Sequence, residues 1–155
     1  MFDLQRALAD FGAAHTVRAN RICHVVGLPA IAAAVLGALA HLRFVVADQP
    51  LDAAMLLLVC TFLLDAVLNV RIAVGVALAG AALYFAARPL PWAALGLLYA
   101  LGWTLQLAGH RVFERNAPAF TQNALHLFVG PRWLINRVVR AIPELPAPST
   151  GDHAQ

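Results

Sequence analysis

Residues 105–119 read Leu-Gln-Leu-Ala-Gly-His-Arg-Val-Phe-Glu-Arg-Asn-Ala-Pro-Ala, and they lie where a long apolar run gives way to polar sequence. Within this stretch Gln106, His110 and Glu114 follow one another at intervals of four residues. Positions four apart share one face of an α-helix, so these polar groups form one stripe. Polar and ionisable groups at membrane depth are costly and by default mark a functional site. The stretch therefore predicts a helix that leaves the membrane and carries a functional site around His110.

The composition of the chain is that of a membrane protein. Of its 155 residues, 61% are hydrophobic and only 12% are charged, whereas soluble domains carry about 25% charged residues. We expect a single membrane domain over residues 1–142 and a disordered, proline-rich tail over residues 143–155. All eleven basic residues are arginine. In a membrane protein these arginines indicate how the chain is oriented across the bilayer and where it contacts lipid headgroups. They do not indicate nucleic-acid binding.

Four apolar runs predict an all-α integral membrane bundle with about four transmembrane helices, because a span needs about 20 apolar residues. The runs cover about residues 22–46, 51–69, 72–87 and 90–109. The third run is short and Asp65 interrupts the second, so a short re-entrant pair in place of these two spans is the alternative.

Amphipathic helices are expected at the membrane interface at both ends of the chain. One is predicted over residues 2–16, and two short ones over residues 118–129 and 131–141. In the last of these, Arg132 and Trp133 are residue types that suit the headgroup layer.

The arginines predict the orientation of the bundle. All of them except Arg43 and Arg88 fall on one side of a four-span arrangement, which places both termini in the cytoplasm. The arginine-only, alanine- and leucine-rich composition indicates a bacterial inner membrane. An even number of spans also brings the start of the first helix and the end of the fourth to one leaflet. Residues near His24 are therefore expected to meet residues near His110.

The side chains that would meet there are suited to a metal ion. They are His15, Asn20, His24, Gln106, His110 and Glu114. Three imidazoles beside a carboxylate suit a divalent transition metal such as Fe(II) or Zn(II). Gln106 and Glu114 are predicted to be a fourth ligand or partners that orient the imidazole. The alternative is that these histidines only contact headgroups and that His110 and Glu114 form an ordinary helix pair.

Two motifs carry a resemblance to a known family. The first is His15-x4-Asn20-x3-His24-x2-Gly27-x-Pro29, and the second is Trp103-x2-Gln106-x2-Gly109-His110-x2-Phe113-Glu114-x3-Pro118-Ala119. Together they resemble the two signatures of the Mpo-type 2-hydroxy fatty acid dioxygenases, a family of small multi-span membrane proteins. The resemblance covers about residues 10–140. The chain departs from the family pattern at Thr16, where a second histidine is common, and at Arg137, where an acid is common.

The resemblance implies an Fe(II)-dependent dioxygenase that converts a long-chain 2-hydroxy fatty acid and dioxygen into the acid one carbon shorter and carbon dioxide. It implies that His15, His24 and His110 hold the iron, and that Asn20, Gln106 and Glu114 match the family's amides and acid. We expect an arginine to hold the substrate carboxylate, because the guanidinium fork matches its geometry. The candidates are Arg18, Arg21, Arg111 and Arg115.

Two other functions remain open at this point. One is a small membrane transporter or ion-binding protein, in which the polar stripe and Asp65 would line a path. The other is a catalytically altered member of the same fold that binds lipid without metal.

Overall fold

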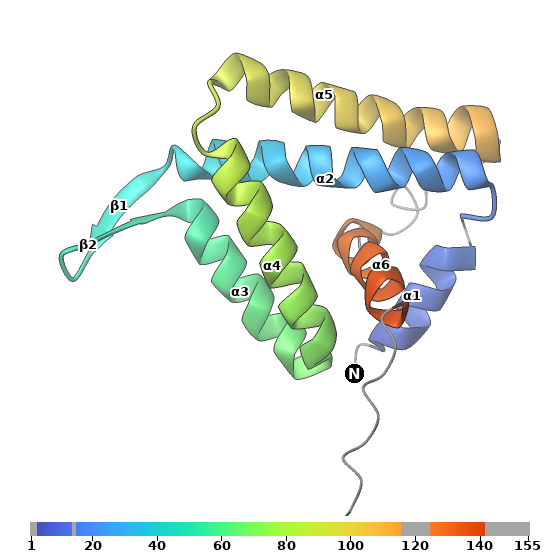
Figure 1. The fold of residues 1–155 in the computed structure, drawn as a ribbon, viewed down its shortest axis with the longest axis horizontal. Helices are drawn as coiled ribbons and strands as arrows, with labels where there is room; N and C mark the ends of the chain where they lie inside the picture. Colours follow the sequence, from blue (N-terminus) through green and yellow to red (C-terminus); the bar gives the residue numbers. More distant parts are fainter. Residues whose placement is uncertain (1–2, 14, 116–124, 142–155) are drawn as a thin grey trace, which may run out of the picture.

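The structure is a computed structural model that describes residues 3–13, 15–115 and 125–141 (Figure 1). This part of the chain is mainly helical, as predicted, and the predicted tail lies outside it. The elements in chain order are α1 (Leu4–Ala13), α2 (Arg18–Ala40), β1 (Arg43–Val46), β2 (Gln49–Asp52), α3 (Ala53–Leu68), α4 (Val70–Ala87), α5 (Trp92–Ala108), the π-helical turn η1 (Gly109–Glu114) and α6 (Leu125–Ala141).

Helices α2 and α5 lie side by side and antiparallel along their length (Figure 1). Their backbones touch at Gly27 and Gly102, where a methyl group on Gly102 would lie only 2.9 Å from the carbonyl oxygen of Gly27. Further along, the Cα of Gly109 abuts the side chain of Asn20. Small residues allow such close approach of helices. This contact brings the start of α2 to the end of α5, which confirms the predicted convergence.

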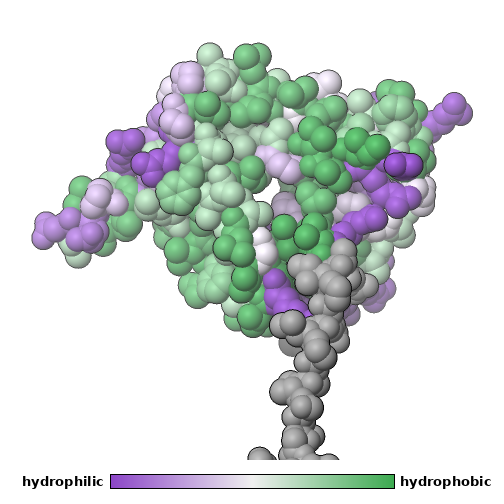
Figure 2. All heavy atoms as spheres, in the orientation of Figure 1, coloured by the Kyte–Doolittle hydropathy of each residue, from purple (hydrophilic) through white to green (hydrophobic). Residues whose placement is uncertain are grey.

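Two helices, α2 and α4, are long and apolar enough to cross a membrane by length and composition, and α3 is apolar but shorter. Figure 2 shows hydrophobic side chains over the α3–α4 pair, between hydrophilic groups at the β-hairpin and at the opposite side of the molecule. The described residues thus contain two candidate spans, and the arrangement with four spans stays a prediction.

The first predicted span, which corresponds to helix α2, differs from its predicted bounds at both ends. It begins at Arg18 and ends at Ala40, while residues 43–46, which we assigned to the first span, form strand β1. This part of the prediction is wrong because the aromatic and β-branched sequence Phe44-Val45-Val46 precedes a two-residue turn. Ala47 and Asp48 have φ angles of 47° and 63°, the left-handed values that a tight hairpin turn needs.

The α3–α4 pair is bounded by side chains that cap helices. Asp52 Oδ1 accepts a hydrogen bond from the Met55 amide at 2.9 Å at the start of α3. Asn69 separates the two helices, and its Oδ1 accepts a hydrogen bond from the Ile72 amide at 3.1 Å at the start of α4. Asp and Asn are preferred at this position because their oxygens satisfy otherwise unpaired amides.

Helix α6 is one continuous helix that packs against α1. The prediction of two short interfacial helices over residues 118–129 and 131–141 is wrong for the described residues 125–141. Leu8 and Phe11 of α1 share a buried core with Val129 and Trp133 of α6. The helix continues through Pro131, since the residues on either side of it are held in this core. The apolar face of α1 therefore lies on protein, and not on the membrane surface as we expected. Residues 118–124 lie outside the described part.

Candidate metal centre

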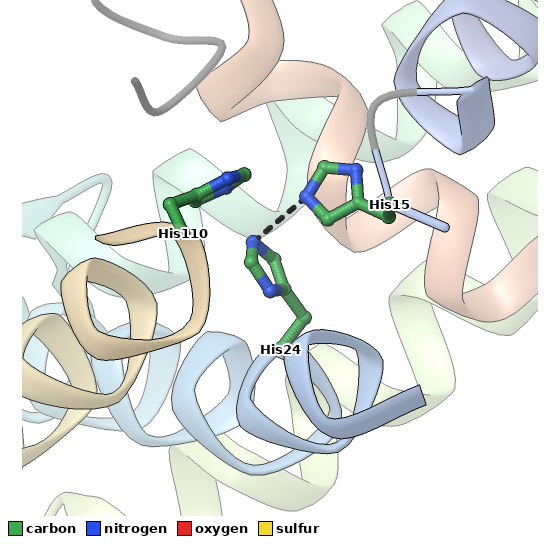
Figure 3. Close-up of side chains that lie close together, drawn as sticks. All are labelled: His15, His24 and His110. Carbon is green, nitrogen blue, oxygen red and sulfur yellow. Dashed lines mark hydrogen bonds between the residues drawn. The ribbon is translucent and has the colours of Figure 1, made fainter. Parts of the chain in front are cut away.

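Three histidines from three segments meet in one buried cluster (Figure 3). His15 follows α1, His24 lies in the second turn of α2, and His110 lies in η1. The ring centroids of His15 and His24 are 4.3 Å apart, and that of His110 is 4.9 Å from each. One ligand nitrogen from each ring lies within 4.8 Å of the others. The chain turns after His15, before α2 begins at Arg18, and this turn allows His15 to face His24.

The backbone fixes which nitrogen of two of these rings carries a proton. Nδ1 of His15 lies 2.5 Å from the carbonyl oxygen of Phe11, and Nδ1 of His24 lies 3.0 Å from that of Asn20. A carbonyl can only accept, so each Nδ1 must donate. In the neutral rings each Nε2 then presents a lone pair. Histidines that bind metal through Nε2 usually have Nδ1 bonded to a carbonyl oxygen in this way.

The two Nε2 atoms are placed for a shared cation. They lie 3.0 Å apart (dashed line in Figure 3), a hydrogen bond that requires one of the two Nε2 atoms to carry a proton. When both rings are neutral with Nδ1 as the donor, both Nε2 lone pairs are available to a cation instead. Two nitrogens bound to one metal ion at about 2.1 Å lie roughly 3.0–3.4 Å apart for bond angles of about 90–110°. The residues present therefore fit a metal ion.

His110 completes the cluster. Burial lowers the pKa of His110, and the charge of a protonated His15 would lower it further. The neutral imidazole is the form that binds metal, so the lowered pKa favours binding. The His110 Nδ1 atom is buried and makes no hydrogen bond within the described part of the chain.

Glu114 does not join the histidines but fastens η1 to the start of α2. Its carboxylate accepts hydrogen bonds from the Thr16 amide at 2.7 Å, the Thr16 hydroxyl at 2.6 Å and Asn20 Nδ2 at 2.7 Å. Burial alone would raise the pKa of Glu114, but these hydrogen bonds and one from the Val17 amide outweigh burial and lower the pKa to about 2. The carboxylate is therefore ionised at neutral pH and complements the positive end of α2.

The predicted stripe of Gln106, His110 and Glu114 is broken by the π-helical turn. A π-helix has more residues per turn than an α-helix, so positions four apart no longer align, and such turns recur at functional sites. Gln106 and His110 line one cavity, whereas Glu114 turns towards α2. Gln106 is 5% exposed and lies against Gly27.

A largely apolar cavity of about 510 Å³ adjoins two of the histidines, His24 and His110. His24, Gln106 and His110 line it together with side chains of α2 to α6, mostly aliphatic. Figure 2 shows a hollow near the middle of the face on which α4 and α6 lie. Ligand sites are typically apolar cavities of about 300–1,000 Å³ with a few polar groups. The cavity can therefore take an apolar chain whose polar end meets the histidines.

The four arginines expected to hold a carboxylate are not among the described residues that line this cavity. Arg18, Arg111 and Arg115 are exposed, and Arg21 is half-buried with its Nη2 bonded to the Thr16 carbonyl oxygen at 2.6 Å.

Sequence reasoning missed Arg132 at this site. We expected Arg132 and Trp133 in the headgroup layer, but both are buried, at 3% and 6% exposure. Arg132 Nε bonds to Oδ1 of Asp65 at 2.6 Å, and Arg132 lines the cavity. Trp133 packs against His15, with ring centroids 5.7 Å apart. The available signal was Asp65 itself, because a buried carboxylate in an apolar helix requires a partner.

The fold and the cluster define a small helical protein with apolar, span-length helices and a buried three-histidine site suited to a metal ion. Residues 1–142 match the model of a protein family described as "2-hydroxy-palmitic acid dioxygenase Mpo1-like". The chain belongs to this Mpo1-like family. No curated protein and no solved structure matches it. The family name points to a dioxygenase of fatty acid metabolism, an oxidoreductase.

Proposed function

We propose that this protein is an Fe(II)-dependent dioxygenase that performs α-oxidation of long-chain 2-hydroxy fatty acids in a bacterial inner membrane. The substrate and dioxygen would give the acid one carbon shorter, carbon dioxide and water. One observation carries the proposal: three buried histidines have converging nitrogens, and two of them, His24 and His110, line a largely apolar cavity. The description of the family supports the substrate class.

In this proposal each of the site residues has a defined task. His15, His24 and His110 hold the ion, and the carbonyl oxygens of Phe11 and Asn20 orient two of the rings. Iron(II) supplies the one-electron chemistry through which dioxygen reacts with an organic acid. Gln106 offers an amide nitrogen that makes no hydrogen bond within the described residues, so it can donate to a polar group of the substrate.

Glu114 and Asn20 act in this proposal by holding the site together. Their side chains bond to each other across the junction between α2 and η1, which fixes the position of His110 relative to His24. The aliphatic lining of the cavity holds the acyl chain and excludes water.

The test measures metal content and turnover on one sample purified in detergent. Bound metal is quantified, and then Fe(II), oxygen and 2-hydroxypalmitic acid are supplied under turnover conditions. We expect about one iron per chain and oxygen-dependent formation of the acid one carbon shorter. Iron without product would refute the proposed reaction while leaving a metal site, and absence of iron after reconstitution would refute the metal site itself.

Matched histidine variants make this test specific. H15A, H24A and H110A should each lose iron and product. H41A is the control, because the His41 ring is exposed at the far end of α2, where its Nε2 contacts the Leu90 carbonyl oxygen at 3.2 Å. Equal iron content in H41A and H110A would contradict the assignment.

A further inference from the structure

Asp65 on α3 and Arg132 on α6 form a buried ion pair, and Arg132 is one of the residues that line the cavity. Their side chains are 0% and 4% exposed, and Arg132 Nε donates to Asp65 Oδ1 at 2.6 Å. Arg132 Nη1 donates to the carbonyl oxygen of Phe128 at 2.5 Å. The guanidinium carbon lies 3.2 Å from the centre of the Phe128 ring. The guanidinium is therefore held from three directions.

One nitrogen of this guanidinium remains available. Arg132 Nη2 is buried and makes no hydrogen bond within the described part of the chain, and the same holds for Oδ2 of its partner Asp65. The ion pair is a single bond and not the two-pronged arrangement that Arg and Asp commonly form. A buried donor without a partner is costly, so its retention calls for an acceptor that arrives from outside.

The surroundings indicate the chemistry of that acceptor. Arg132 lines the same cavity as His24 and His110, and it is the one arginine among its described lining residues. The rest of the lining is mostly aliphatic and aromatic. An anionic head on an acyl chain is strongly unfavourable in such a cavity unless a hydrogen-bond donor meets it, and Arg132 Nη2 is a donor without a partner in the described part of the chain.

We propose that Nη2 of Arg132 anchors the carboxylate of an acyl chain bound in this cavity. The inference rests on the proposed function and deepens it, since it assigns the recognition of the acid group to a residue other than the metal ligands. Asp65 and the Phe128 carbonyl oxygen hold the guanidinium so that Nη2 is the donor left over. Arg132 is thus the residue that makes the cavity select a free acid over a neutral lipid.

The experiment compares binding of radiolabelled 2-hydroxypalmitic acid with that of its methyl ester. The full-length protein is used in detergent, without oxygen and with a chelator, so that no metal contributes to the preference. The test variant is D65N/R132M, which removes both charges of the pair together. R137M is the control, because Arg137 is an exposed arginine on the same helix. Partitioning into micelles cancels when variants are compared in the same detergent.

We expect D65N/R132M to bind the acid about 10- to 100-fold more weakly than the wild type, as for the loss of one hydrogen bond to a charged group. Binding of the methyl ester should change less than about twofold, and R137M should behave as the wild type. D65N alone keeps the anchor and should keep the preference for the acid.

Several results would overturn the anchor. One is a D65N/R132M variant that still prefers the acid, and another is a D65N variant that loses the preference as fully as the double variant does. A wild type that binds acid and ester equally overturns it even where a variant fails to fold. A wild type that prefers the acid but forms no product with iron and oxygen would refute the proposed reaction and support the anchor.

Discussion

The hydrogen bonds that Glu114 accepts from Thr16 and Asn20, called the clamp below, join η1 to the start of α2. The substitution E114Q tests whether this clamp holds the histidine site together. Glutamine has nearly the same shape as glutamate, but it has one acceptor oxygen and no charge. If its oxygen stays with the donors of Thr16, its NH₂ group replaces Oε2, which lies 2.7 Å from Asn20 Nδ2. Two donors would then face each other.

The magnitude follows from these contacts. A hydrogen bond to a charged group is worth about 1.5–3 kcal/mol, and E114Q removes one and weakens the others. Because the carboxylate is partly exposed, we take the lower end and expect a loss of about 2 kcal/mol in the free energy of unfolding. For a chain of this size such a loss lowers Tm by about 4–8 °C. Metal affinity should fall about 10- to 100-fold, as is typical when a group that supports a ligand is removed.

The assay follows tryptophan fluorescence during heating of the detergent-purified protein, with and without Fe(II), and bound iron is quantified in parallel. A charge swap serves as the sharper control. N20D alone would oppose two carboxylates and should be less stable than E114Q. N20D/E114Q restores a carboxylate facing an amide and should recover at least half of the loss. If E114Q keeps the Tm and iron content of the wild type, or if the swap recovers nothing, the clamp is not what positions His110.

Three further predictions follow from the same geometry. The pKa of Glu114 is lowered to about 2 in the folded chain, so its carboxylate stabilises the fold fully above its ordinary pKa near 4.5 and loses this effect as the pH falls from there towards 2. In a pH series the difference in Tm between wild type and E114Q should therefore shrink over this window. A constant difference would contradict the assignment. Fe(II) at about 100 times its Kd should stabilise the wild type by about 2.7 kcal/mol and raise its Tm, whereas H110A should show no rise. G102A should destabilise the protein by about 1–3 kcal/mol in thermal unfolding, because its methyl group would lie 2.9 Å from the carbonyl oxygen of Gly27; G96A in the same helix, where nothing lies within 4 Å, should be neutral or slightly stabilising, and equal effects would refute the close contact.

The histidine cluster could be predicted because hydropathy and spacing carry enough information to place it. The apolar runs fix which helix ends meet, and His24 and His110 lie at two such ends. His15 required only a turn, which the polar sequence after it supplies. The same reasoning gave the clamp partners Asn20 and Glu114 as neighbours, although not their bond to each other.

The role of Arg132 could not be predicted, because hydropathy does not distinguish a helix face packed on protein from one packed on lipid. Arg132 lies on an amphipathic helix, which is typical of headgroup contact, and its partner Asp65 is 67 residues away in the chain. Only the packing of α6 on α1 and α4 determines that this face is buried. The π-helical turn could not be predicted either, because the amino-acid composition of residues 109–114 does not distinguish it from an α-helix. The turn changes the direction in which the Glu114 side chain points.

The departure at Thr16 is compatible with the proposed metal site. The family commonly carries a second histidine at this position, but here the Thr16 hydroxyl donates to Glu114 at 2.6 Å and is exposed, outside the buried cluster. Three imidazoles converge without any contribution from this position. Threonine instead adds a donor to the clamp, since its amide and hydroxyl both bond to the same carboxylate oxygen. If this reasoning holds, T16H leaves the number of bound irons per chain unchanged and T16V weakens the clamp, whereas a gain of metal affinity in T16H would mean that this position faces the ion.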